Sequence, residues 1–323
     1  MLLPPLRYVV EFARNVMNIL ITGATGLVGT ALTQTFSREG HNVYRLLRPG
    51  SEKRDRPPER FCDIPWTPEQ PEIGKLPGGG GREVDAIINL AGASVAGGRW
   101  TQKRKTLLSS SRIETTRGVI NAIAHRKTRP GVLISASAIG YYGDRGDEVL
   151  TESSSAGQGF LAELAKDWEA EAVKAEALGV RVVLARFGII LAKHGGALPQ
   201  MAAPFKFGLG AKLGSGRQWT SWVSLEDVVN IIRTALAEDS YAGPVNFVSP
   251  APVTNAEFTK VLGEVLHRPA IFSAPGFVLR LAMGEMADGA LLASERVAPK
   301  VLQQSGYPFI HYDLRKALLA ILH

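Results

Sequence analysis

The sequence predicts an α/β fold, a doubly wound parallel sheet with a smaller C-terminal substrate lobe. From Asn18 onward, short runs rich in Ile, Leu and Val alternate with longer amphipathic stretches, a pattern typical of βαβ units. A glycine-rich turn, ITGATGLVG over residues 21–29, follows the first run and opens the first amphipathic stretch. Parallel strands need crossover helices between them, so the alternation and the turn predict the same architecture.

Each strand is predicted from a short apolar run and each helix from a longer amphipathic one. Residues 49–83 interrupt the pattern with seven prolines and the run Gly78 to Gly81, so they are predicted to be mostly loop. The expected strands are 18–22, 41–49, 84–92, 130–138 and 180–186, with a short one near 60–64 inside the loop, and the expected helices are 26–40, 101–126, 159–178 and 254–266.

Residues 17–250 are predicted to form a nucleotide-binding domain, with substrate-lobe segments from about residue 188. A mainly helical region is expected at 251–323. The opening residues 1–16 contain two prolines and a glutamate and lack a basic start, so they are interpreted as a disordered leader or a mis-assigned start.

The composition, 45% hydrophobic and 21% charged, is that of an ordinary globular protein. The net charge of +7 comes from Lys and Arg spread along the chain, which favours a phosphorylated cofactor and an anionic substrate over nucleic acid. No apolar run is long enough to span a membrane, and a cytoplasmic protein is expected. Cys62 is the single cysteine and the six histidines lack metal-ligand spacing, so no metal is expected.

The turn after the first strand carries the strongest functional signal. Gly23, Gly26 and Gly29 stand in G-x-x-G-x-x-G spacing between a strand and a helix. Such a loop lets a pyrophosphate approach the backbone at the positive end of the helix dipole. The motif predicts a Rossmann dinucleotide site, whose expected contacts are Gly23, Thr25, Gly26, Leu27 and Val28.

The end of the second strand predicts which dinucleotide binds. An acid there would accept a hydrogen bond from the 2′-hydroxyl of NAD(H), whereas an arginine would bind the 2′-phosphate of NADP(H). The strand has no acid and ends at Arg48, with Arg45 three residues earlier, so NADP(H) is expected; a solvated surface arginine is the alternative. After the fourth strand, Leu90, Ala91 and Gly92 are expected beside the nicotinamide half of the cofactor.

Motifs along most of the chain together resemble one family. In order they are ITGATGLVG, INLAG (88–92), SRIETT (111–116), SASAIGYYG (135–143), RFGIIL (186–191), GSGRQWTSWVSLEDV (214–228) and TNAEF (254–258). The combination resembles the epimerase family proteins of the atypical extended short-chain dehydrogenases/reductases, the YfcH-like group. The resemblance implies a Rossmann domain with a small substrate lobe and a family-specific helical C-terminus.

Active members of that superfamily use a tyrosine as acid and base, with a lysine four residues later. The helix predicted at 159–178 contains no tyrosine; Phe160 stands where a ring belongs, and Lys166 has the wrong spacing. Tyr312 and Lys316 have the right spacing but lie beyond the sheet at the C-terminus. The usual Tyr-x-x-x-Lys pair is therefore expected to be absent.

The loop after the fifth strand is the next candidate for proton transfer. The segment SASAIGYYG places Ser137 at the strand end and Tyr141 and Tyr142 in the loop. A tyrosine here could reach the nicotinamide from the other side, so these three residues are the catalytic candidates. In the alternative interpretation both rings pack on the substrate lobe and the serines cap the strand.

Three further residues are candidates for substrate binding. Arg112 stands where active relatives carry a structural asparagine, and it could bind a phosphate or carboxylate; a charge on a helix face is the alternative. Arg217 and Gln218 lie in a segment that contacts a nucleotide or sugar in extended relatives, although an amphipathic core hairpin would have the same pattern.

Two functions fit these observations. The first is an NADP(H)-dependent epimerase or oxidoreductase acting on a small polar, possibly nucleotide-linked substrate. The second is a non-catalytic regulator that senses NADP(H). The substrate-lobe segment over 214–228 favours the enzyme, and the oligomeric state stays open.

Overall fold

The computed structural model describes residues 16–50, 61–73, 76 and 83–323. The leader expected over residues 1–16 falls almost entirely outside these ranges. None of the helices within them combines the length and the apolarity needed to cross a lipid bilayer.

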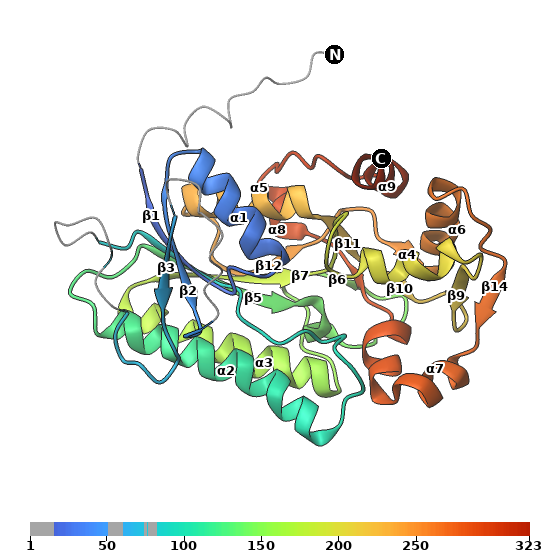
Figure 1. Cartoon of the computed structure of the whole chain (residues 1–323), viewed down its shortest axis with the longest axis horizontal. Helices are drawn as coiled ribbons and strands as arrows, with labels where there is room; N and C mark the ends of the chain where they lie inside the picture. Colours follow the sequence, from blue (N-terminus) through green and yellow to red (C-terminus); the bar gives the residue numbers. More distant parts are fainter. Residues whose placement is uncertain (1–15, 51–60, 74–75, 77–82) are drawn as a thin grey trace, which may run out of the picture.

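A seven-stranded sheet lies at the centre of the molecule (Figure 1). Its strands are β1 (Asn18–Thr22), β2 (Asn42–Leu47), β3 (Phe61–Pro65), β4 (Ala86–Asn89), β5 (Val132–Ala138), β7 (Arg181–Phe187) and β12 (Gly243–Phe247). All neighbouring pairs are parallel, in the order β12-β7-β5-β4-β1-β2-β3. The six strands predicted up to residue 186 are confirmed, including the short one at β3, and β12 is an addition that the sequence does not predict.

Helices cover both faces of this sheet (Figure 1). The covering helices are α1 (Leu27–Arg38), α2 (Gln102–Ala124), α3 (Phe160–Val173) and α5 (Leu225–Ala237). In β1, Ile19 and Ile21 belong to the core beneath α1 and α5, whereas Leu20 belongs to the core beneath α2 and α3. Both faces are therefore buried, which explains why the strands are almost continuously apolar.

The strand order reverses between β1 and β4. From β1 the chain proceeds outward through β2 to β3, and the later strands lie on the other side of β1. Ligands of doubly wound sheets bind in the crevice outside the carboxyl ends of the strands at such a reversal. Here those ends are the glycine loop after β1 and residues 90–92 after β4.

A smaller lobe lies at one end of the sheet (Figure 1). Its elements are β8 (Ile189–Leu191), α4 (Leu198–Lys206), β9 (Ala211–Leu213), β10 (Trp219–Thr220), β11 (Trp222–Ser224), β13 (Val253–Thr254), α6 (Asn255–Val265), β14 (Phe272–Ala274) and α7 (Gly276–Met283). Strand β8 pairs with β11, β9 with β14, and β10 with β13. The predicted start of α6 is confirmed, because the Thr254 hydroxyl accepts a hydrogen bond from the Glu257 N–H at 3.2 Å.

The C-terminal segment returns from this lobe to the sheet. It contains η4 (Ala287–Leu292), β15 (Arg296–Val297), α8 (Lys300–Gln304) and α9 (Leu314–Leu322). Strand β15 pairs with β6 (Val149–Leu150), α8 packs beside β12, and α9 packs on α6. Residues 251–323 thus contain α6, α7, α8 and α9, and they contact both the lobe and the central sheet.

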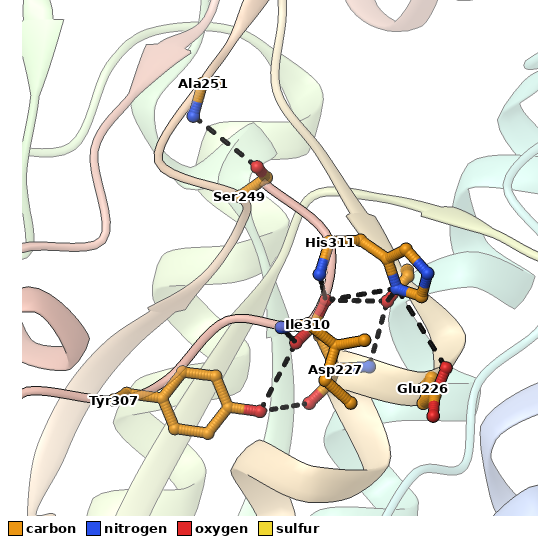
Figure 2. Close-up of polar contacts among 8 residues, drawn as sticks. Glu226, Asp227, Ser249, Ala251, Tyr307, Ile310 and His311 are labelled. Atoms are coloured by element: carbon orange, nitrogen blue, oxygen red, sulfur yellow. Dashed lines mark hydrogen bonds and ion pairs between the residues drawn. The ribbon is translucent and has the colours of Figure 1, made fainter. Parts of the chain in front are cut away.

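One buried carboxylate fastens this returning segment to α5 (Figure 2). Asp227 is completely buried and accepts hydrogen bonds from the Ser224 hydroxyl at 2.8 Å and from the N–H groups of Ile310 and His311 at 2.9 and 3.1 Å. The Tyr307 hydroxyl donates to the backbone carbonyl of Asp227 at 3.3 Å. The first turn of α5 therefore holds residues 307–311 in place.

Candidate functional site

The glycine loop and the end of β4 touch each other at the strand reversal. Gly23 has a φ of +64°, and a Cβ there would lie 2.6 Å from the carbonyl carbon and oxygen of Leu90. A Cβ on Gly29 would collide with the Gly23 carbonyl oxygen and the Ala24 Cα. These two glycines are needed for the protein's own packing, because a side chain at Gly23 would push the loop away from the β4 end and one at Gly29 would collide with the backbone of the glycine loop itself.

Gly26 is different, because a Cβ there would meet only the Gly23 oxygen, at 3.2 Å. It is the N-cap of α1, with extended backbone angles, and the first turn of the helix carries no acidic residue. The first N–H groups of an α-helix have no partner within the helix, and its dipole is positive at this end. The geometry of the loop thus suits an anion, and Gly26 is the least crowded of its three motif glycines.

Polar side chains hold the β4 end in position. The Thr22 hydroxyl donates to Asn89 Oδ1 at 2.7 Å and accepts from the Leu90 N–H at 3.1 Å. Asn89 Nδ2 donates to the Thr116 hydroxyl at 2.8 Å, and the Trp168 indole N–H donates to the same hydroxyl at 2.9 Å. Residues 90–92 are therefore fixed relative to β1, α2 and α3.

A cleft of about 370 Å³ opens at this point. It is bounded by the glycine loop, the ends of β4, β5 and β7, helices α2 and α3, and residues 289–295.

Eight of the residues predicted from the sequence line it, namely Gly23, Gly26, Leu27, Val28, Leu90, Gly92, Arg112 and Ser137. Thr25 and Ala91 adjoin this lining without belonging to it, and Arg48 lies exposed just beyond the end of β2.

Arg45, which precedes Arg48 on β2, is already engaged. Its guanidinium forms two hydrogen bonds with the Asp63 carboxylate of β3, at 2.5 and 2.7 Å, and lies 4.1 Å from the centre of the Phe61 ring. Arg45 is thus held against β3, and Arg48, exposed beyond the end of β2, stays the residue predicted for the 2′-phosphate.

Two charged residues line the cleft within the described part of the chain, Arg112 and Glu295. The Arg112 guanidinium donates to the backbone carbonyls of Leu108 and Ala93, both at 3.0 Å, and lies over the Trp168 ring. Burial lowers the pKa of Arg112 to about 10, so the group stays cationic at neutral pH. Arg112 is thus a cleft-lining cation whose partners are two backbone carbonyls and an aromatic ring, none of which neutralises its charge. Such a group can bind an anionic or carbonyl oxygen of a ligand.

Glu295 was not predicted from the sequence. Its half-buried side chain enters the cleft from the segment between η4 and β15. Burial and the nearby negative charge of Asp144 raise the pKa of Glu295 to about 8. No local pattern distinguishes this residue from a surface glutamate, because only the tertiary fold brings it to the cleft.

The Ser137 hydroxyl connects the cleft floor to a buried ion pair. It donates to the Glu169 carboxylate at 2.5 Å, and Arg186 binds both oxygens of that carboxylate at 2.8 Å. The Arg186 and Glu169 side chains are at least nine-tenths buried. Because the Ser137 proton is committed to Glu169, the hydroxyl can serve a ligand only as a hydrogen-bond acceptor.

Neither predicted tyrosine lines the cleft. The Tyr142 hydroxyl donates to Asn246 Oδ1 at 2.7 Å and accepts from Arg186 at 2.9 Å, in a completely buried position. Burial raises the pKa of Tyr142 to about 12. The Tyr141 ring stacks on the Arg186 guanidinium at 3.6 Å. This corrects the expectation that the loop tyrosines reach the nicotinamide, because both rings serve packing around Arg186.

The face of α3 that lines the cleft is apolar, formed by Leu161, Leu164, Ala165 and Trp168. Phe160 lies outside the cleft and packs edge-on against Trp100, 5.3 Å between ring centres. No tyrosine is among the α3 residues that line the cleft.

The two substrate-binding candidates of the lobe also lie outside the cleft. The buried Gln218 amide donates to the backbone carbonyls of Leu213 and Leu291, at 3.0 and 3.2 Å. Arg217 is exposed. Their segment forms β10 and β11, which pair with β13 and β8, so it is neither a hairpin nor part of this cleft.

A doubly wound sheet with a glycine-lined cleft at its strand reversal and an appended lobe defines a class of dinucleotide-binding proteins. The chain belongs to the NAD dependent epimerase/dehydratase family, whose model matches residues 19–247. A domain of unknown function, DUF1731, matches residues 274–321, the segment that contributes Glu295.

Individual relatives confirm the resemblance expected from the motifs. Epimerase family protein Mb2239 of Mycobacterium bovis is 42% identical over 300 residues, which cover 93% of this chain and 96% of the relative. Epimerase family protein YfhF of Bacillus subtilis is 40% identical over 95% of this chain and 98% of its own length. The crystal structure of human epimerase family protein SDR39U1 (isoform2) with NADPH matches with a TM-score of 0.82 and 30% identity, covering 95% of this chain and 99% of the human chain.

Proposed function

We propose that this protein is an NADP(H)-dependent enzyme that reduces, oxidises or epimerises a small polar substrate in the cleft at the strand reversal. One observation carries the proposal: the glycine loop and the β4 end form a cleft that also holds a cation, Arg112, and an acid, Glu295. A protein that only binds a dinucleotide would need the glycine loop and the β4 end, but not the cation and the acid beside them.

The residues present fit the cofactor. The pyrophosphate would lie at the N-terminus of α1, where Gly26 leaves room and the helix dipole favours an anion. Arg48 would bind the 2′-phosphate of the adenosine half. The nicotinamide half would lie toward Ser137 and the β5 end, across the strand reversal. The relationship to a human protein whose structure contains NADPH supports the same cofactor.

The chain's own side chains supply orientation and polarity for the reaction. The bound cofactor would supply or accept a hydride. Arg112 would hold a substrate oxygen that carries or develops negative charge, and Ser137 would accept a hydrogen bond from a substrate hydroxyl. The apolar face of α3 would exclude water from the reacting atoms.

Calorimetric titration with NADPH and NADH tests the cofactor assignment. Hydrogen bonds to charged groups contribute about 1.5–3 kcal/mol, so NADPH should bind at least about tenfold more tightly. The Arg48→Ala variant should lose most of this preference, whereas Arg217→Ala, which removes another exposed arginine, should keep it. Equal affinities of the native protein for the two cofactors would contradict NADP(H) specificity.

A substrate screen with NADPH-loaded protein tests catalysis. Turnover of a carbonyl or sugar-like compound is expected, with a loss of about 10²-fold or more in Arg112→Ala. Tight NADPH binding without turnover of any compound would instead favour a regulator that senses NADP(H).

A further inference from the structure

The backbone around Glu295 is held on both sides by hydrogen bonds. The Ser294 N–H donates to Asp144 Oδ1 at 3.2 Å, and the Ser294 hydroxyl donates to the Gly146 carbonyl at 2.6 Å. The Glu295 N–H donates to the Trp219 carbonyl at 3.2 Å, and its carbonyl accepts from the Ser221 hydroxyl at 2.7 Å. The backbone therefore fixes where this side chain enters the cleft.

The carboxyl group of Glu295, by contrast, makes no hydrogen bond or ion pair with any residue in the described ranges. The other cleft groups differ in this respect, since Ser137 donates to Glu169 and Arg112 donates to two carbonyls. The half-buried carboxyl group of a cleft-lining residue that has no protein partner is available to a ligand.

The charges around Glu295 favour its protonated form. Asp144, whose charge acts on Glu295, accepts hydrogen bonds from the N–H groups of Gly146 and Ser294. Arg296, next in the chain, is stacked on the Trp219 ring at 4.3 Å, and the cation that shares the cleft is Arg112. Burial and the Asp144 charge raise the pKa of Glu295 to about 8, so it can both give and take a proton near neutral pH.

We propose that Glu295 is the residue that transfers the proton in this cleft, on the substrate oxygen, in place of the tyrosine that α3 lacks. This inference rests on the proposed function and adds to it the residue that acts as both acid and base. When the carbon of a substrate carbonyl takes up the hydride that the bound cofactor would supply, the C=O π bond breaks and its electron pair passes to the oxygen. Glu295 gives that oxygen its proton and becomes a carboxylate, which regains a proton from water; oxidation of an alcohol runs the same steps in reverse.

The other candidates are unsuited to this task. The Ser137 hydroxyl already donates its proton to a carboxylate, and the buried Tyr142 hydroxyl lies outside the cleft. Arg112 stays protonated at neutral pH and cannot act as a base. Glu295 is the one cleft-lining residue, among those described, that changes its protonation near pH 7–8.

Proton release on cofactor binding tests the inference without any substrate. The nicotinamide ring of NADP⁺ is positively charged and that of NADPH is neutral, so NADP⁺ should favour the Glu295 carboxylate and release a proton. Calorimetry at pH 7.5 in buffers of different ionisation enthalpy measures this release. The native protein should release more protons with NADP⁺ than with NADPH, and Glu295→Gln, which keeps the size of the side chain, should lose the difference.

The affinity for NADP⁺ gives a second readout. For the native protein it should rise between pH 6.5 and 9, by about tenfold for each unit by which binding lowers the pKa of Glu295. In Glu295→Gln the affinity should not rise. Asp144→Asn keeps the Oδ1 acceptor for Gly146 and Ser294 but removes the charge, so the midpoint of the rise should move to lower pH, which a purely structural role of Glu295 would not cause.

Two failures of this experiment are distinguishable. If NADP⁺ and NADPH both bind but proton release is equal for the two cofactors and unchanged in Glu295→Gln, Glu295 does not face the reacting end and the inference is overturned. If neither cofactor binds, the proposed function itself is overturned.

Discussion

The three glycines of the cofactor loop have different roles, although the sequence motif treats them alike. Gly23 and Gly29 face backbone atoms of the protein itself, at Leu90 and at Ala24. Gly26 faces the Gly23 oxygen alone, with extended backbone angles that any residue can adopt. A Cβ on Gly26 would thus meet one tight contact of 3.2 Å, whereas the proposed pyrophosphate would need the space of a whole side chain.

This difference predicts opposite effects of two substitutions. Gly26→Val should abolish NADPH binding, because the side chain fills the space of the pyrophosphate, while the free energy of unfolding falls by at most about 1 kcal/mol. Gly29→Ala should lower the free energy of unfolding by about 1–3 kcal/mol or more, because its Cβ collides with backbone. Calorimetric titration and urea unfolding measure the two effects. Normal NADPH binding by Gly26→Val would show that the pyrophosphate lies elsewhere.

At the scale of elements, the first turn of α5 joins the sheet to the C-terminal segment (Figure 2). Asp227 and Glu226 are neighbours in sequence, and both carboxylates lie within 4.0 Å of the His311 ring nitrogen. Their surroundings are opposite, since the Asp227 side chain is fully buried and that of Glu226 is 62% exposed. Three donor groups form hydrogen bonds with the buried Asp227 carboxylate, whereas water screens the charge of the exposed Glu226 carboxylate.

Asp227→Asn should therefore lower the free energy of unfolding by about 2–4 kcal/mol. The amide NH₂ of asparagine replaces one carboxylate oxygen, so the donor that bonded to that oxygen loses its acceptor, and the remaining hydrogen bonds lose the negative charge that strengthens them. Glu226→Gln is the matched control and should cost less than about 1 kcal/mol. Urea unfolding monitored by tryptophan fluorescence gives both values. Equal effects of the two substitutions would mean that Asp227 does not anchor residues 307–311.

The sequence predicts elements well where a local pattern defines them. The six central-sheet strands β1 to β5 and β7 and the helices beside them follow from apolar runs, and the glycine loop follows from its place between strand and helix. The lobe strands could not be predicted, because each is two or three residues long and pairs with a distant segment, as β10 does with β13. Tyr142 was misjudged for a related reason: its partners Arg186 and Asn246 lie 44 and 104 residues away.

At the scale of the whole molecule, the cleft combines three distant parts of the chain. The glycine loop comes from its start, Arg112 and Ser137 come from the middle, and Glu295 comes from the returning C-terminal segment. The first part could be predicted from the glycine spacing together with its place between a strand and a helix. The last could not, because the hydrogen bonds of Ser294 to the loop at Asp144 and Gly146, which bring Glu295 into position, are purely tertiary.

A crystal structure of the protein with NADPH tests the central claim most directly. The account predicts the pyrophosphate at the N-terminus of α1 beside Gly26, the 2′-phosphate beside Arg48, and the nicotinamide between Ser137 and Glu295. NADPH bound outside the cleft between β1 and β4, or bound there with its nicotinamide turned away from Glu295, would contradict it.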